Sequence, residues 1–374
     1  MMSDYSIDIF DSPEAVSGDW PRGGAEGAYR CHPFQTVAFL ETWQASYGRA
    51  SAARPCLVEV RDRAGRPVMM VPLMIGRIEG CRVLSFADFD FSDYNAPVLF
   101  PTDAVWDRPT ALALWNDITA QLPEFDLLLL GKMPRHVGEL VNPLYFLADE
   151  PNPESCHLTR LDRPWAETEK VVQGATNWRR RHRALQRLGT CELLIARTDK
   201  ERQTILSKLL EQKQRRFEET QVPGFETHPE KRDFLVIGTE KLLAADALHM
   251  SALVVNGEII ATYWSLVQGR HYYGSFPTFE AGEWAKYYPG RVLHYLLLQY
   301  LSEQGYDCLD LGIGNEPWKL AVCDVTVPLV RLRRARTLRG RIALTGLRLR
   351  EKVVGTRFWQ KLRPLKWIML RALP

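Results

Sequence analysis

The chain has 374 residues, a net charge of +3 at neutral pH, 46% hydrophobic residues and 25% charged residues. These values are typical of a globular protein, and they exclude a disordered chain, a collagen-like repeat and a coiled-coil rod. The length favours two domains, because surface-to-volume scaling limits the growth of a single core. No apolar run is long enough to span a membrane and no secretion signal is visible, so the sequence predicts a cytoplasmic protein.

The charge is unevenly distributed along the chain. Residues 331–374 hold 14 lysines and arginines against one acid and carry +13, whereas the preceding 330 residues hold 34 basic and 44 acidic residues and carry −10. Apolar residues recur among the basic ones at helical spacing, which predicts a basic amphipathic helix in a tail at 337–374. We expect this tail to contact an anionic membrane or a membrane-bound synthase from the cytoplasmic side, and we expect no nucleic-acid surface on the acidic body.

The motifs of many large enzyme classes are absent. The seven cysteines form no C-x-x-C pair and the eight histidines form no H-E-x-x-H pattern, so the sequence predicts no metal site. There is also no G-x-x-x-x-G-K-[ST] phosphate loop and no G-x-S-x-G nucleophile elbow. Enzyme classes that depend on these motifs are therefore excluded.

A weak internal repeat organises the chain. Each half begins with a predicted β-hairpin and a further strand, at 56–75 and 82–86 and again at 252–267 and 271–276. Each half continues with a helix-length segment and an aromatic-Asp strand, at 104–122 and 125–131 and again at 290–303 and 306–312. Each copy therefore predicts an antiparallel meander that runs into a strand–helix–strand crossover, whose last two strands are parallel.

The repeat predicts a mixed α/β protein of two units. The proline- and acid-rich segment 149–153 marks the boundary between a unit at 1–150 and a unit at 151–336. Apolar residues at helical spacing predict a helical insert in the second unit, over 165–188 and 200–217. The basic helix at 337–374 follows the second unit.

Short motifs occur in a characteristic order over about residues 30–335. In the first half they are Pro33-Phe34-Gln35-Thr36, Val71-Pro72-Leu73 and Ser92-Asp93-Tyr94. In the second half they are 178–188 (WRRRHRALQRL), 257–261 (GEIIA), 288–293 (YPGRVL), Asp310-Leu311-Gly312 and Glu316-Pro317-Trp318-Lys319. Together they resemble the GNAT acetyltransferase superfamily, in particular its CelD-like branch of cellulose or exopolysaccharide biosynthesis, which is related to the FemABX peptidyltransferases.

The resemblance implies tandem GNAT-like acyl-CoA N-acyltransferase domains and acetyl-CoA as the acyl donor. It implies a coenzyme A site at Tyr288, Gly290, Arg291 and Val292, where the usual phosphate loop is shortened to Pro289-Gly290-Arg291. A glycine at a helix start lets a diphosphate approach free N–H groups. The helix dipole alone is too weak to hold a nucleotide, and Arg291 supplies an additional positive charge. A plain helix start is the alternative. The first half has no comparable residues at 102–106.

Asp310 is the leading catalytic candidate. Alignment of the two aromatic-Asp strands places it opposite Leu129, near the carboxyl end of a central strand, where ligands of α/β sheets gather. A carboxylate there can accept a proton from an amine or hydroxyl acceptor, although a structural ion pair would explain it equally well. Glu316 is a second candidate base, and Tyr273 can give a proton to the departing thiolate or simply pack.

The loop after the same strand holds the candidate acceptor-binding residues. We expect Asn315, Trp318 and Lys319 to contact the acceptor, with Trp318 as a wall of its pocket and Lys319 as a cation for an anionic acceptor. The alternative is that Trp318 is core and that the charged residues are solvated. An arginine cluster at 179–187 can meet phosphates or form a solvated face.

These observations predict a GNAT acyltransferase that moves an acetyl group from acetyl-CoA to an amine or hydroxyl acceptor, such as a saccharide or small molecule. Two alternatives stay open. One is FemABX-like aminoacyl transfer from a charged tRNA, and the other is a non-catalytic GNAT-fold assembly factor.

Overall fold

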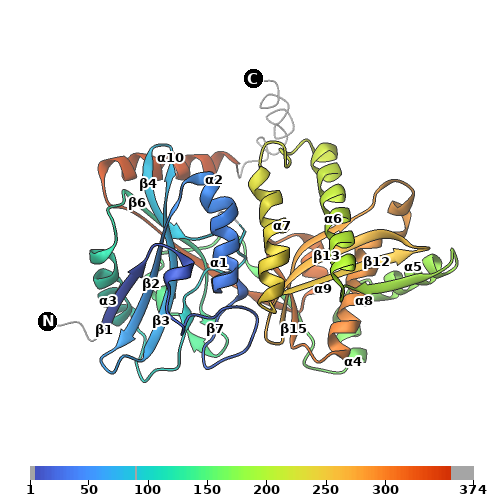
Figure 1. Cartoon of the computed structure of the whole chain (residues 1–374), viewed down its shortest axis with the longest axis horizontal. Helices are drawn as coiled ribbons and strands as arrows, with labels where there is room; N and C mark the ends of the chain where they lie inside the picture. The colour runs from blue at the N-terminus through green and yellow to red at the C-terminus, as the bar shows by residue number, and fades with distance from the viewer. Residues whose placement is uncertain (1–4, 89–90, 355–374) are drawn as a thin grey trace.

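The computed structural model describes residues 5–88 and 91–354. Figure 1 shows two units side by side, each built on a twisted sheet with helices packed against it. No helix in the described ranges is long and apolar enough to cross a bilayer. The two predicted units are therefore visible as two sheets, and the structure tests how the chain divides between them.

The first sheet has the strand order β1-β2-β3-β4-β6-β17-β9, with β5 paired to β3. Its strands are β1 (Tyr5–Phe10), β2 (Arg54–Asp62), β3 (Pro67–Ile78), β4 (Cys81–Phe86), β5 (Val98–Leu99), β6 (Leu127–Pro134), β9 (Glu150–Pro151) and β17 (Leu329–Ala335). β4 and β6 are parallel, joined by the helix α3 (Arg108–Gln121), and the other pairs are antiparallel. The predicted hairpin, crossover helix and parallel pair of the first half are confirmed.

The second sheet has the order β11-β12-β13-β14-β15-β10-β16. Its strands are β11 (Cys191–Ile195), β12 (Leu248–Val255), β13 (Glu258–Gln268), β14 (His271–Phe279), β15 (Cys308–Ile313), β10 (Cys156–Arg160) and β16 (Val325–Val327). β14 and β15 are parallel and are joined by α8 (Pro289–Glu303), as the repeat predicts. Both units thus contain the same meander and crossover, as the predicted tandem organisation requires.

The helical insert of the second unit is confirmed and is longer than predicted. It consists of α4 (Trp165–Val171), α5 (Ala175–Gln186), α6 (Asp199–Thr220) and α7 (Pro229–Ala244). A reciprocal capping box between Thr198 and Glu201 fixes the start of α6. The sequence did not predict α7, whose buried residues include Phe234, Leu235 and Leu242.

The remaining elements are short and mostly connect the sheets, except for α10, which has 17 residues. They are α1 (Val37–Trp43), α2 (Arg49–Ser51), α9 (Pro317–Val322), α10 (Leu338–Val354), the hairpin β7 (His136–Val137) and β8 (Leu140–Val141), the 3₁₀ turns Pro13–Ala15, Pro33–Gln35, Pro143–Leu147 and Gly282–Tyr287, and the π turn Gln44–Gly48.

The predicted boundary at residue 336 needs a correction. β17 lies before that boundary, yet it pairs with β6 and β9 of the first sheet, so the chain returns to the first unit after completing the second. α10 then packs on the same sheet, and Leu344 is buried against Cys81, Val83 and Leu127. The arginine-rich sequence of β17 did not predict a strand, although both of its leucines, Leu329 and Leu332, are buried. Residues 355–374 of the predicted tail lie outside the described residues.

The two units share one continuous core at their interface. α1 of the first unit packs on α7 of the second, and the shared cluster includes Phe39, Phe234, Trp264 and Tyr273. The Gly24 N–H also donates to the Ala245 carbonyl across the interface, at 2.9 Å. Because side chains in a tightly packed core have little freedom to move, this shared core can hold side chains of the first unit in fixed positions against the second sheet.

Candidate active site

The second sheet opens between β14 and β15. Their parallel ladder ends where Tyr273 faces Asp310. Beyond that point β14 continues along β13 to Phe279, whereas β15 pairs with β10 on its other side through Ile313. The divergence leaves a split in the sheet next to the start of α8, and the candidate residues lie on both sides of it.

A cavity of about 490 Å³ lies on the α8 side of the split. Its lining includes four residues that the sequence singled out, Tyr288, Gly290, Arg291 and Trp318, together with Tyr263 and His294. Trp318 was predicted to form a wall of the acceptor pocket, and the structure places it in this cavity beside Arg291 instead. The volume falls within the usual range of small-ligand sites, about 300 to 1,000 Å³.

The start of α8 leaves one N–H group free toward this cavity. Tyr288 precedes the helix with φ +54° and caps it with no side-chain hydrogen bond. The N–H groups of Arg291 and Val292 both donate to the Tyr288 carbonyl, and the Val292 side chain is buried in the core. The Gly290 N–H has no acceptor among the described residues. Of the predicted backbone donors, Gly290 is therefore the one available to a ligand.

Gly290 is also needed where it stands for a steric reason. A Cβ on this residue would lie 2.9 Å from Cδ1 of Phe279. The Phe279 ring, which is half exposed, packs directly over the helix start. A larger residue would displace this ring and reshape the mouth of the cavity.

Two guanidinium groups without carboxylate partners flank the helix start. Arg291 lies 4.5 Å from the ring centre of Trp318 and 5.9 Å from that of Trp178. Arg181 of α5 lies 5.2 Å from the ring of Tyr288. Within the described ranges neither arginine forms an ion pair, and burial lowers the pKa of Arg291. Unpaired cations on aromatic faces beside a free N–H form a suitable site for an anion.

His294 adds a neutral hydrogen-bonding group to the same cavity. Its Nδ1 lies 3.2 Å from the Tyr263 hydroxyl, while its Nε2 is buried and has no partner in the described part of the chain. Burial and the nearby charge of Arg291 lower the pKa of His294 to about 3, so the imidazole is neutral at physiological pH. The orphaned Nε2 can make one hydrogen bond to a ligand in the cavity.

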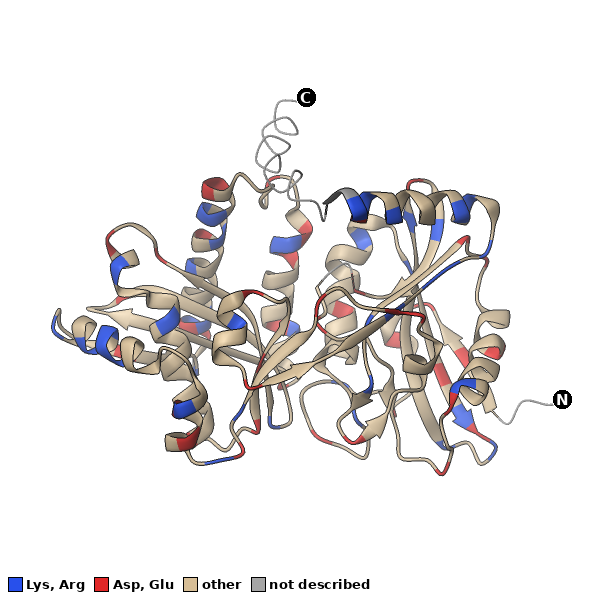
Figure 2. Cartoon of the chain, turned by 180° about the vertical axis from the view of Figure 1, so that it is seen from behind, with Lys and Arg blue, Asp and Glu red and all other residues tan. Residues whose placement is uncertain are grey.

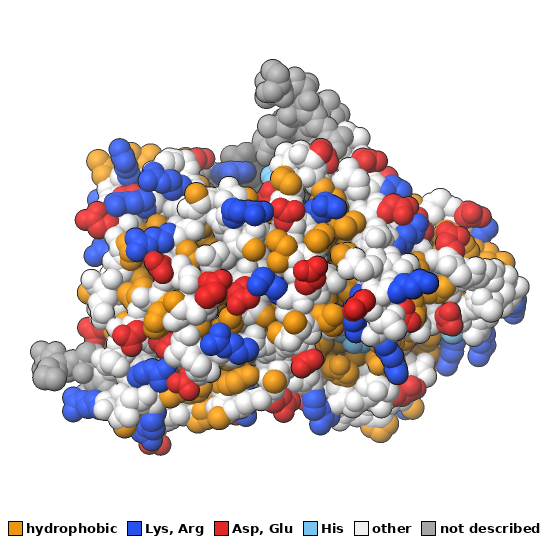
Figure 3. All heavy atoms as spheres, in the orientation of Figure 1, with side chains coloured by type: hydrophobic (Ala, Val, Ile, Leu, Met, Phe, Trp, Pro, Cys, Tyr) orange, Lys and Arg blue, Asp and Glu red, His pale blue; other side chains and the backbone are white. Residues whose placement is uncertain are grey.

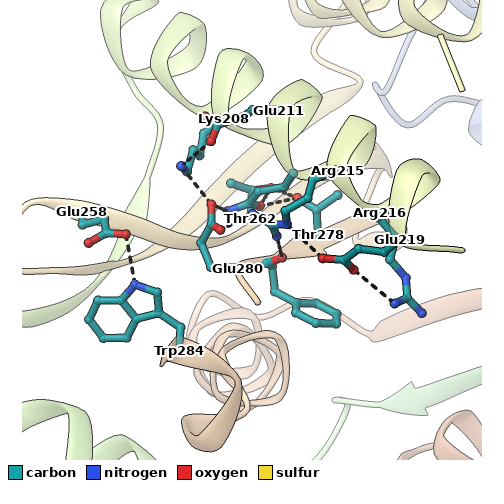
Figure 4. Close-up of polar contacts among 12 residues, drawn as sticks. Lys208, Glu211, Arg215, Arg216, Glu219, Glu258, Thr262, Thr278, Glu280 and Trp284 are labelled. Atoms are coloured by element: carbon teal, nitrogen blue, oxygen red, sulfur yellow. Dashed lines mark hydrogen bonds and ion pairs between the residues drawn. The ribbon is translucent and has the colours of Figure 1, made fainter. Parts of the chain in front are cut away.

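A polar network on the opposite face of the sheet fixes the end of β14 (Figure 4). Glu280, the residue after β14, accepts from Lys208 at 2.8 Å and from Gln212 at 3.1 Å, and it also pairs with Arg215. Arg215 donates to the Phe279 carbonyl as well, at 2.7 Å. Burial raises the pKa of Glu280, but these basic partners outweigh it and the pKa is lowered. The network braces α6 against the strand that carries Phe279.

Asp310 lies at the end of the parallel ladder, fully buried between the two units. One carboxylate oxygen accepts the Gly312 N–H at 2.7 Å. The other accepts the hydroxyl of Tyr94, from the first unit, at 2.6 Å and lies 3.2 Å from Nε2 of His271. Burial alone would lower the pKa of His271, but the Cys308 thiol and the Asp310 carboxylate raise it to about 10. Asp310 is therefore held by three donors, which suits a positioning group better than a free base.

Tyr273 belongs to the same interface cluster. Its hydroxyl lies 2.9 Å from Nδ1 of His32, whose ring stacks on Tyr94 with a centroid distance of 4.3 Å. His32, His271 and Tyr273 line a second cavity of about 470 Å³ between the units. No local sequence pattern marks Tyr94 as a partner of Asp310, since 216 residues separate the two.

Asp93 is a second carboxylate at this interface. Its Oδ1 accepts the Ile313 N–H at 2.9 Å, and its carboxylate fills the space beside the α-carbon of Gly312. Burial raises the pKa of Asp93 to about 7. The hydrogen bond from the Ile313 N–H opposes this shift, and the charge of Asp310 adds to it. Unlike Asp310, it remains partly exposed. Asp93 was quoted as part of a family motif, and no local pattern marked it as a site residue.

The predicted acceptor-binding residues are mostly engaged in local structure. Asn315 accepts from His157 at 3.0 Å and from the Ser155 N–H at 3.3 Å. Lys319 is buried, donates to the Ile313 carbonyl and lies 3.5 Å from Glu316, which is half exposed at the start of α9. These contacts hold the loop after β15. A role for Asn315, Glu316 or Lys319 toward the acceptor stays a prediction.

The predicted groups thus fall on two faces of the second sheet. Tyr273 packs in the interface core with Trp264, whereas Tyr263 and Leu311 pack under α8. Side chains alternate along a strand, so Asp310 and Tyr273 point away from the cavity of Arg291. The split between β14 and β15 is where the two faces approach each other. In the part of the chain that the structure describes, no cluster of three His, Cys, Asp or Glu residues suits a metal ion.

A family model, described as the acetyltransferase (GNAT) domain, matches residues 173–320. The matched segment contains α5, α8, the split and most of the cavity lining. No curated protein matches the sequence.

Solved structures resemble the whole chain in fold. The structure of FemX gives a TM-score of 0.56 at 11% identity and covers 82% of this chain and 92% of its own. The C-terminal domain (DUF2156) of a putative lysylphosphatidylglycerol synthetase from Agrobacterium fabrum gives 0.51 at 11% identity, over 86% and 92% of the two chains. A conserved protein of unknown function from Bacteroides thetaiotaomicron gives 0.50 at 11% identity, over 80% and 90%. The CelD-like assignment stays a prediction. The chain therefore has a tandem GNAT-like fold, and residues 173–320 of its second unit match the GNAT acetyltransferase domain.

Proposed function

We propose that the protein is an acyltransferase that takes an acyl group, acetyl in the simplest case, from coenzyme A and transfers it to an amine or hydroxyl acceptor. The observation that carries the proposal is the open start of α8, where, among residues 5–88 and 91–354, Arg181 and Arg291 have no carboxylate partner and the Gly290 N–H has no acceptor. The acceptor would approach the split from the interface between the units.

The residues around the α8 cavity fit coenzyme A. The Gly290 N–H and the two guanidinium groups would hold its diphosphate, because charge-assisted hydrogen bonds to phosphate are among the strongest in proteins. The orphaned Nε2 of His294 offers a further hydrogen bond deeper in the cavity. Bound there, coenzyme A would supply an activated thioester at the split.

We assign the proton acceptor to Asp93, because its carboxylate lies beside Gly312, just past the end of the β14–β15 ladder. Its pKa of about 7 leaves much of it ionised at neutral pH while keeping it a strong enough base. In the proposed step the acceptor nitrogen or oxygen bonds to the acyl carbon, the carbon–sulfur bond breaks, the thiolate leaves and the acceptor proton moves to Asp93. Asp310 would position this group by holding Gly312, Tyr94 and His271 in place.

Aminoacyl transfer from a charged tRNA is the second candidate. It is favoured by the exposed arginines Arg180 and Arg183 of α5, which line a surface hollow. Phosphate contacts of this kind give binding that weakens steeply with salt. The similarity to FemX concerns the fold and does not choose between the two donors.

The test is an assay of thiol release from acetyl-CoA with a panel of amine, saccharide and peptide acceptors. We expect acceptor-dependent release that the Asp93→Asn variant lacks. Salt-sensitive tRNA binding with no binding of acetyl-CoA would favour the second candidate. Binding of neither donor would leave a non-catalytic assembly factor, and any role in polysaccharide synthesis would be decided by which acceptor reacts.

A further inference from the structure

α10 has two apolar faces, although only one of them is covered. The helix runs from Leu338 to Val354 along the first sheet, at the upper left of Figure 1. One face packs on β4, β6 and β17, and the opposite face, defined by Leu338, Ile342 and Leu349, is exposed. We call the second surface the outer face of α10.

The inner face is firmly attached to the first unit. Gly340 lies so close to Asp126, the residue before β6, that a Cβ would clash with the Asp126 carbonyl oxygen, and Leu344 is buried. Glu351, the acid of α10, forms ion pairs with Arg331 at 3.0 Å and Arg333 at 2.8 Å. The negative charge of this helix is therefore neutralised toward the sheet and not displayed to the solvent.

The outer face exposes large apolar side chains in one row. Leu338 is 73% exposed, Ile342 is 68% exposed and Leu349 is 58% exposed. Their spacings of four and seven residues place them on one side of the helix, opposite Gly340, Leu344 and Glu351. Exposed apolar residues are ordinary when scattered, but a row on one helix face is typical of an interaction surface.

Basic side chains border this row on both sides. Arg341 and Lys352 flank it on one edge, and Arg339 and Arg350 flank it on the other, as a helical projection at 100° per residue shows. All four are exposed, and none forms an ion pair within the described ranges. Figure 2 shows the basic residues along α10, and Figure 3 shows hydrophobic and basic side chains next to each other over this helix.

We propose that the outer face of α10 docks on an anionic lipid bilayer. An apolar row buries itself at the boundary of the acyl chains, while bordering arginines and lysines reach the headgroup phosphates. Two features favour lipid over an acidic protein: the charge is of one sign on both edges, and the chain continues with 20 residues that hold five lysines and arginines and no acid.

The attachment of the inner face gives this docking a structural consequence. Because α10 is part of the first unit, binding would hold the whole enzyme at the bilayer in one orientation, unlike a tail on a flexible tether. The proposal does not rest on the identity of the acyl donor, and its test needs no activity assay.

The test is co-sedimentation of the full chain with vesicles of phosphatidylcholine alone or mixed with phosphatidylglycerol. We expect binding to the mixed vesicles that weakens with salt. The Leu338→Ser/Ile342→Ser variant and the Arg339→Ala/Arg341→Ala variant should each lower the partition coefficient at least about tenfold. The matched controls Val105→Ser and Arg108→Ala, which change exposed residues elsewhere in the first unit, should bind as the wild type does.

Circular dichroism and the melting temperature check that the variants fold, which we expect because the altered side chains are exposed. Wild-type partitioning of both α10 variants would overturn the proposal, and so would complete loss of binding on truncation after Val354. A lipid-independent dimer that the α10 variants abolish would also overturn it, because the outer face would then bind a second copy. Partial binding after truncation that the α10 substitutions remove would support it.

Discussion

The two units share one topology but differ at the start of the crossover helix. In the first unit, Asp107 caps α3 and accepts the Thr110 N–H at 2.8 Å, so a carboxylate already occupies the place where an anion would bind. In the second unit, α8 starts without a side-chain cap and is flanked by Arg181 and Arg291. Under the proposed function, the comparison teaches that the fold alone does not make a donor site. The helix start must also be left uncapped and supplied with unpaired cations.

The splits between the parallel strands differ in the same way. In the first sheet the ladder ends with Ser85 facing Leu129, and an ion pair of 2.9 Å between Asp88 and Lys132 lies beyond it. In the second sheet it ends with Tyr273 facing the buried carboxylate of Asp310. The first unit instead contributes Asp93 and Tyr94 to the second split. We infer that one unit acts as a support and the other as the reaction centre.

The largest expected effect comes from replacing Asp93, the carboxylate that the first unit contributes to the split in the second sheet. The Asp93→Asn variant should lower the turnover number by about 10² to 10⁴, the usual contribution of a general base. In the wild type the rate should rise with pH around a midpoint of about 7, because Asp93 must be ionised to accept a proton. This limb of the pH–rate profile should vanish in the variant. An unchanged turnover number would remove Asp93 from the mechanism.

The Asp310→Asn variant tests the buried cluster that joins the units. We expect it to lower the free energy of unfolding by about 3 to 5 kcal/mol, because the charged partner of His271 is lost inside the protein. Chemical denaturation measures this change. The neutral amide should also let the pKa of His271 fall, since the Asp310 carboxylate helps to raise it to about 10. NMR titration of the His271 ring gives a readout that packing alone would not move, and an unchanged pKa would contradict the pairing.

Substitutions of two arginines of α5 distinguish acyl-CoA from charged tRNA as the donor. Arg181→Ala should raise the KM for acyl-CoA about tenfold, because a charge-assisted hydrogen bond is worth about 1.5 to 3 kcal/mol and this site is partly solvated. Arg183→Ala, two residues further along α5 on the opposite side of the helix and exposed, is the matched control and should leave that KM unchanged. Equal losses in both variants, measured by steady-state kinetics, would indicate a more extended polyanionic donor.

Glu280→Gln should have the smallest effect, about 1 to 3 kcal/mol of stability at neutral pH, because Lys208 and Arg215 lose their charged partner. The pKa of Glu280 is lowered from its ordinary 4.5, so its contribution is fully present above that pH and is lost as the pH falls through the lowered value. Thermal melting from pH 7 to pH 3 should show the two proteins converging in acid. A constant difference in melting temperature would contradict this.

Local patterns in the sequence predicted the parts of the fold that are local. The hairpins, α8 and the two parallel pairs follow from short turn signals and helical spacing, and so does the position of Asp310 in β15. Contacts between distant segments left no such trace. Asp93 reaches Ile313 across 220 residues, and β17 returns to the first sheet with a sequence that reads as part of a basic tail. Such contacts form only when the two units pack together, and a short segment of sequence carries no information about that packing.

The measurement that tests the central claim most directly is calorimetric binding of acetyl-CoA to the wild type and two single variants. Arg291→Ala removes a cation at the open start of α8, and Arg108→Ala removes one at the capped start of α3. We predict that acetyl-CoA binds the wild type and Arg108→Ala with equal affinity and binds Arg291→Ala at least about tenfold more weakly. No binding to the wild type, or equal weakening in both variants, would contradict the assignment of the donor site to the second unit.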